Sequence, residues 1–102
     1  MTTGGAPNPA LKAYEEKIRA QLDEAKAKLS RYEAQAKEAK AQAEISIINS
    51  AKTARENIDR KLHDLKTMHD ADMTRGKADI DSAVAKFKAS VDEVGAKLKE
   101  HM

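Results

Sequence analysis

The sequence predicts an all-α fold in which a long helix and a shorter C-terminal helix form an elongated, antiparallel coiled-coil hairpin. Charged residues make up 35% of the 102 residues and aromatic residues only 3%. This composition is typical of long helices and unlike that of β-sandwiches or barrels. No Gly or Pro occurs in residues 10–75, where apolar residues recur at steps of three and four, as on one helix face.

The first helix is expected to start at Pro9. Residues 1–8 contain two glycines and a proline, so we expect a disordered tail there. Asn8 can cap the first turn, and a proline at the first helical position loses no hydrogen bond. The hairpin itself is expected to occupy residues 9–102, with the long helix covering about 9–72.

An apolar stripe along this helix runs from Leu11 to His69 with a mean spacing of about 3.6 residues. We therefore expect a locally straightened coiled coil rather than a uniform left-handed supercoil. Alanines such as Ala25 and Ala36 occupy the stripe in the N-terminal half. Since small residues bury little area, that half is predicted to be weak and able to open or exchange partners.

The turn is expected at about residues 73–78, because Gly76 can end a helix in the left-handed conformation and Asp79 can cap the next. The second helix then covers about 79–101, with a regular heptad seam from Ile80 to His101. The seam within the chain is predicted to contain Ile58, Leu62, Leu65, Ile80, Val84, Phe87, Val91 and Val94.

Two other arrangements remain open. Asn49 and Ser50 can form a tight turn, which gives a more symmetric hairpin with arms of about 40 and 50 residues. Alternatively, Gly76 lies inside a helix at a cost of about 1 kcal/mol, and the whole chain is one rod.

A hairpin with unequal arms leaves apolar side chains exposed, because the shorter helix reaches only about residues 50–74 of the longer one. We therefore expect self-association, most simply a twofold dimer in which residues 9–45 of one copy pack on the hairpin of the other. The predicted protein interface consists of Leu11, Tyr14, Ile18, Leu22, Leu29, Tyr32, Ile45, Ile47 and Ile48.

The function predicted from these patterns is non-enzymatic: a structural, scaffold or oligomerisation protein that acts through helix–helix contact. Its partners are expected to be further copies of itself, as a homodimer or larger assembly, and another helical protein. No catalytic motif is present in the sequence. The alternatives are a stress-protective protein that becomes helical on drying, and an amphipathic helix that binds membrane surfaces.

We expect no cofactor, metal or small-molecule substrate. His63 and His69 are six residues apart and do not share a helix face, which leaves only the spacings His69/Asp72 and Asp70/Met73. Acidic and basic residues are interleaved, with a net charge of +2, so nucleic acid is not an expected partner. No signal peptide or transmembrane segment is recognisable, so a cytoplasmic location is expected and a membrane is not an expected partner.

Overall fold

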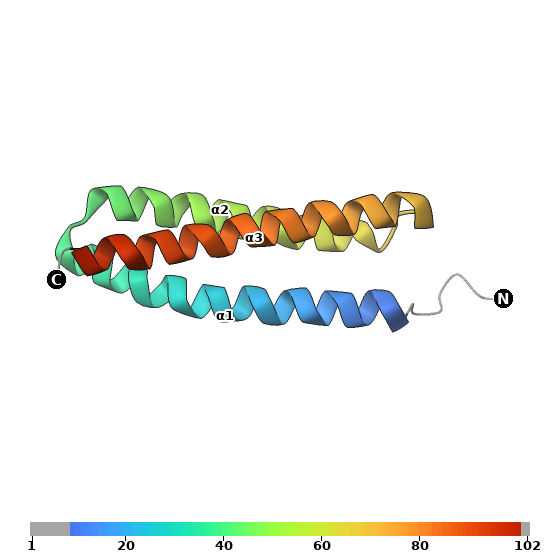
Figure 1. Cartoon of the computed structure of the whole chain (residues 1–102), viewed down its shortest axis with the longest axis horizontal. Coiled ribbons are helices and arrows are strands. Elements are labelled where there is room, and N and C mark those ends of the chain that lie inside the picture. The colour runs from blue at the N-terminus through green and yellow to red at the C-terminus, as the bar shows by residue number, and fades with distance from the viewer. Residues whose placement is uncertain (1–8, 101–102) are drawn as a thin grey trace.

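The computed structural model describes residues 9–100, which form three α-helices. Helix α1 covers Pro9–Ala39, α2 covers Gln42–Leu65 and α3 covers Asp70–Glu100. They lie side by side in a body of 59 × 19 × 15 Å (Figure 1). The prediction of an elongated, all-helical chain is confirmed. The predicted tail over 1–8 and the last seam position, His101, lie outside the described residues.

The chain reverses direction twice, so α1 and α3 run the same way and α2 runs back between their ends (Figure 1). Ion pairs fix the direction of α2: Glu15 pairs with Lys66, and Glu33 pairs with Lys52. Near the start of α1, the Tyr14 hydroxyl contacts Asp81 of α3. Each helix can therefore bury one face against the other two.

The first reversal occurs at Lys40 and Ala41. Lys40 has a φ of 56°, its N–H donates to Lys37 O at 3.2 Å, and the Ala41 N–H donates to Ala36 O at 2.9 Å. These two bonds form the Schellman motif that ends many helices, usually with glycine at the left-handed position. The predicted continuous helix over 9–72 is therefore wrong. The alternatives of a turn at 49–50, which lies inside α2, and of a single rod are wrong as well.

The second reversal occupies residues 66–69. The N–H groups of Lys66, Thr67 and Met68 each donate to the carbonyl three residues earlier, and the Thr67 hydroxyl donates to Asp64 O at 2.9 Å. Helix α3 then begins with Asp70 and Asp72 in its first turn, where carboxylates favour the positive end of the helix dipole.

The predicted turn over 73–78 is wrong, because these residues lie inside α3. Gly76 serves packing instead of chain reversal. A Cβ at this position would lie 2.8 Å from Leu65 Cδ1 and 2.9 Å from Met68 Sδ. The missing side chain thus lets the end of α2 and the following link approach the backbone of α3 closely.

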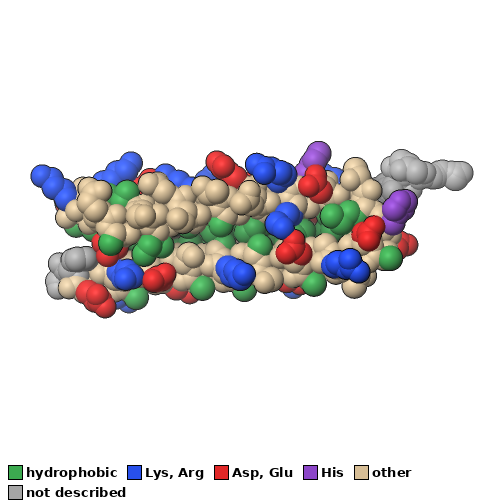
Figure 2. All heavy atoms as spheres, turned by 90° about the horizontal axis from the view of Figure 1, so that it is seen from above, with side chains coloured by type: hydrophobic (Ala, Val, Ile, Leu, Met, Phe, Trp, Pro, Cys, Tyr) green, Lys and Arg blue, Asp and Glu red, His purple; other side chains and the backbone are tan. Residues whose placement is uncertain are grey.

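The core runs the length of the bundle along one face of each helix. Figure 2 shows apolar side chains along the line between neighbouring helices, flanked by acidic and basic side chains. All eight residues predicted for the seam within the chain are buried. Among residues 9–100, the large buried apolar residues are Ile18, Leu22, Leu29, Ile48, Ile58, Leu62, Leu65, Ile80, Val84, Phe87, Val91, Val94 and Leu98.

Candidate interaction site: the contact of α1 with α2 and α3

Helices α1 and α3 have the same length but contribute unequally to the core. Each contains 31 residues. Helix α3 buries six large apolar side chains, whereas α1 buries three, namely Ile18, Leu22 and Leu29, together with the small Ala25 and Ala36. Because burial free energy grows with the apolar area removed from water, α1 is held less strongly by its core residues than α3 is.

At the N-terminal end of α1, Tyr14 makes a polar contact with α3. Its hydroxyl donates to Asp81 Oδ1 at 2.7 Å and lies 3.0 Å from Lys77 O, while Lys77 Nζ lies 5.2 Å from the ring centroid. Partial burial, and then the hydrogen bond to the Asp81 carboxylate and its charge, raise the pKa of Tyr14. The phenol therefore remains a hydrogen-bond donor at all ordinary pH values.

Two ion pairs on the surface connect α1 to α2. Glu15 lies 3.3 Å from Lys66 Nζ, and Glu33 accepts a hydrogen bond from Lys52 at the other end of the contact. That bond, followed by the charges of Lys52 and Lys37, lowers the pKa of Glu33 below its ordinary value. Since the lysines are about half exposed, both pairs are weakened by salt.

At the C-terminal end of α1, Tyr32 packs on a glycine of α3. A Cβ at Gly95 would lie 2.8 Å from both Cζ and the hydroxyl oxygen of Tyr32. Gly95 is buried, whereas Tyr32 is only partly buried. The ring therefore covers the backbone of α3 and remains able to swing toward solvent.

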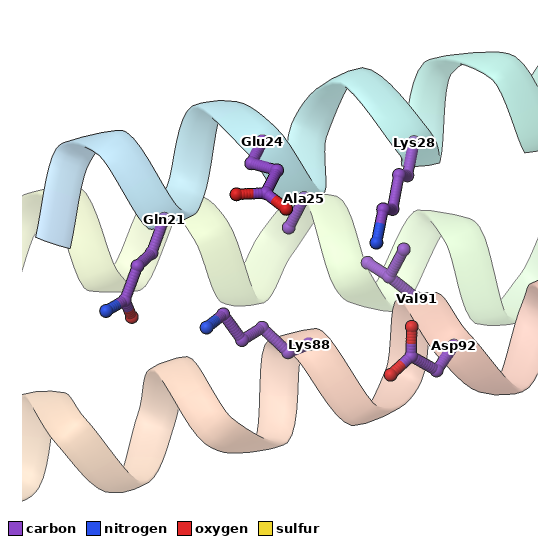
Figure 3. Close-up of a pocket in the computed structure, with 7 residues that line it drawn as sticks. All are labelled: Gln21, Glu24, Ala25, Lys28, Lys88, Val91 and Asp92. Carbon is purple, nitrogen blue, oxygen red and sulfur yellow. The ribbon is translucent and has the colours of Figure 1, made fainter.

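A shallow groove separates the middle of α1 from α3 (Figure 3). Its floor contains Ala25 of α1 and Val91 of α3, both of them buried. The groove continues toward Tyr14 in a second hollow that shares Gln21 and Lys88 with the first. The small side chain of Ala25 leaves this space, since a larger apolar residue there would extend toward Val91. The lining residues of the two hollows are Lys17, Ile18, Gln21, Glu24, Ala25, Lys28, Asp81, Val84, Ala85, Lys88, Val91 and Asp92.

The rim of this groove carries both signs of charge. Lys28 and Lys88 stand among Glu24 and Asp92 (Figure 3). Such a rim does not favour an anionic or a cationic ligand as a class.

The core face of α2 includes two charged residues, which sequence reasoning missed. Glu44 is 5% exposed, and Arg55 occupies the position that continues the series 44, 48, 51, 55 and 58. Within residues 9–100, the Arg55 Nε is buried without a hydrogen-bond partner, and its guanidinium lies 3.9 Å from Asp59. Arg55 is only partly buried, and so are Ile47 and Ala54, which belong to the apolar stripe predicted from Leu11 to His69.

All nine predicted interface residues pack, fully or in part, against the core of a single chain. Ile18, Leu22, Leu29 and Ile48 are buried in its core. The expectation that the N-terminal stripe stays exposed in a single copy is therefore wrong, because the reversal at Lys40 supplies a third helix that covers it. The remaining predicted interface residues are partly buried against the same core: Leu11, Tyr14, Tyr32, Ile45 and Ile47.

The residues considered for metal binding are spread over three segments. His63 is exposed on α2, His69 is exposed in the second link, and Asp70, Asp72 and Met73 open α3. In the described part of the chain, no three His, Asp or Glu side chains are grouped closely enough to hold an ion. None of the helices over 9–100 has an apolar stretch long enough to cross a membrane.

The contact of α1 thus combines a small apolar centre with polar or aromatic contacts at both ends. Comparison of the chain with protein-family models, with curated proteins and with solved structures found no match.

Proposed function

We propose that this protein is a non-enzymatic structural module that works by helix–helix contact. In this proposal α2 and α3, here termed the helical pair, form a stable platform, and α1 is an exchangeable helix that another helix can replace. The observation that carries the proposal is the unequal burial in two helices of equal length: three large apolar side chains in α1 and six in α3.

The helical pair is expected to keep much of its packing when α1 leaves. Leu62 and Leu65 of α2 and Phe87 of α3 are among its fully buried side chains, and Lys61 forms an ion pair with Asp79 between the two helices. Detaching α1 exposes its own three large side chains, at roughly 1.5–3 kcal/mol each. It also exposes the surfaces of the pair that they cover, which an incoming helix would cover again.

The groove beside Ala25 indicates what a competing helix needs. A leucine in the place of Ala25 would fill space next to Val91 that α1 leaves open. Three additional carbon atoms in this shallow groove are only partly buried, so they add apolar burial worth about 1.4 kcal/mol. A partner helix with this feature would bind the helical pair more tightly than α1 itself.

Peptide binding to the full-length protein tests the proposal. A fluorescent peptide of residues 9–39 should bind saturably, as measured by anisotropy, and the same peptide with Ala25→Leu should bind about tenfold more tightly. A peptide with Leu22→Asp and Leu29→Asp serves as the control and should not bind. If neither of the first two peptides binds the folded protein, the proposed exchange of α1 is wrong.

A further inference from the structure

We propose that the helix that replaces α1 is the α1 of a second copy, so that two chains form a domain-swapped dimer by opening the link at Lys40 and Ala41. This inference rests on the proposed exchange of α1 and names its partner. In the dimer, each α1 continues straight into its own α2 and packs on the helical pair of the other copy.

The link itself favours opening. Lys40 has a φ of 56° and is, within residues 9–100, the single non-glycine residue with a positive φ. A side chain in this conformation is strained by contact between Cβ and the backbone. A continuous helix relieves this strain, because Lys40 and Ala41 then adopt ordinary helical angles. Short links under strain favour domain swapping.

The sequence permits a continuous helix through the link. No glycine or proline occurs between residues 10 and 75, so nothing in the chain breaks a helix from Pro9 to Leu65. Such a helix of 57 residues would be about 86 Å long. Once it is straight, α1 points away from its own helical pair and can reach only that of a second chain.

The swap preserves every contact that holds α1. The hydrogen bond from Tyr14 to Asp81 and the packing of Tyr32 on Gly95 would form between chains with the same geometry. The ion pairs of Glu33 with Lys52 and of Glu15 with Lys66 would do so as well. Domain swapping is therefore a low-cost route to a dimer for this chain.

The second link lacks the features that favour opening. Residues 66–69 contain no left-handed residue, and Met68 packs against Gly76. Opening this link would also separate α2 from α3, which share the larger part of the buried apolar side chains. The exchange is thus expected at Lys40 alone.

Mixed cysteine variants test the swap directly, since the natural chain has no cysteine. A Glu33→Cys chain and a Lys52→Cys chain are refolded together at high concentration and treated with a short bifunctional thiol reagent. The swap places these positions of different chains side by side, so a covalent heterodimer should form in high yield. The control mixes an Arg19→Cys chain with a Lys52→Cys chain. It should give little covalent heterodimer, because Arg19 lies about 21 Å along α1 from Glu33.

Variants of Lys40 provide a second test by light scattering over a range of concentrations. Lys40→Gly should raise the dissociation constant of the dimer by about tenfold or more, because glycine suits the turn and disfavours the straight helix. Lys40→Val should lower it, since a β-branched residue tolerates the left-handed conformation least. Residue 37 is helical in both the single chain and the swapped dimer, so Lys37→Gly should leave the dissociation constant unchanged.

The outcomes separate this inference from the proposed function. Chains that stay monomeric at every concentration overturn the swap, and if the peptide of residues 9–39 still binds, the exchange of α1 stands. A dimer that links Arg19→Cys to Lys52→Cys as readily as Glu33→Cys to Lys52→Cys also overturns the swap, because the copies then associate without exchanging α1.

Discussion

Helices α1 and α3 are equal in length and run in the same direction, yet they are held by different means. Helix α3 is anchored by six large apolar side chains. Helix α1 has three, and its ends are fastened by Tyr14, Tyr32 and ion pairs at the surface. The comparison shows that the number of helical residues says little about how firmly a helix is bound. How firmly the helix is bound depends on the size of the residues on its buried face.

The largest effect is expected from placing charges on the buried face of α1. Leu22→Asp combined with Leu29→Asp would bury two carboxylates without partners, so α1 should detach from the helical pair. Hydrogen exchange should then show loss of protection over residues 9–39, with protection retained in α2 and α3. If α2 and α3 lose protection to the same extent, α1 is not a separable part of the bundle.

A smaller but global effect is expected from the core of α3. Phe87→Ala should lower the free energy of unfolding by about 3–5 kcal/mol, because it leaves a cavity in place of a fully buried ring. Urea denaturation followed by circular dichroism measures this change. The matched variant Leu29→Ala in α1 should cost less, and an equal or larger cost would contradict the proposed difference between the two helices.

The same urea titrations on unmodified protein test whether the chain has a folded core in dilute buffer. A bundle should show strong helicity and one cooperative transition. The stress-protective alternative requires a chain that is largely unstructured in water and gains helix on drying. Low helicity without a transition would therefore contradict the bundle and favour that alternative.

The two glycines of α3, Gly76 and Gly95, should respond differently to alanine. Both variants gain helix propensity of about 1 kcal/mol. At Gly76 the new methyl group meets Leu65 Cδ1 in the core, so the free energy of unfolding should fall by about 1 kcal/mol net. At Gly95 it meets the end of the Tyr32 ring, which can swing aside, so the net change should be within about 0.5 kcal/mol. Thermal melts of both variants measure this difference, and a larger loss at Gly95 would contradict it.

The smallest effect is expected from the ion pair of Glu33. The pKa of the Glu33 carboxyl is lowered in the folded chain relative to the ordinary value of 4.5. The pair therefore stabilises the fold above pH 4.5, and this contribution is lost as the pH falls through the lower folded pKa. Melting temperatures between pH 6 and pH 3 should fall slightly less for Glu33→Gln than for the natural chain. Identical profiles would show that the pair contributes nothing measurable.

The helical fold and the seam of α3 could be predicted from sequence because their signals are local. Ile80, Val84, Phe87, Val91 and Val94 follow a regular heptad, and each is buried. The break at Lys40 could not be predicted, since its left-handed position carries lysine where the recognisable signal is glycine. Packing of a third helix compensates for the cost of a left-handed lysine. That packing joins residues far apart in the sequence, so no local sequence pattern indicates it.

The face of α2 was also misjudged, for a physical reason. Its core face includes the buried Glu44 and the partly buried Arg55, whereas the apolar stripe follows Ile47 and Ala54, which are also only partly buried. Because Ile47 and Ala54 keep the apolar stripe continuous past Lys40, the stripe gave no sign of the helix break there. Gly76 was misjudged in a similar way, because a glycine that permits close packing and one that ends a helix look alike in sequence.

Both tyrosines of the chain lie at the contact of α1 with α3, one near each end, and the chain has no tryptophan. Ultraviolet emission excited at the phenol band therefore comes entirely from this contact. Any movement of α1 away from α3 changes that emission, so the natural chain carries its own optical reporter of the step on which its proposed action depends.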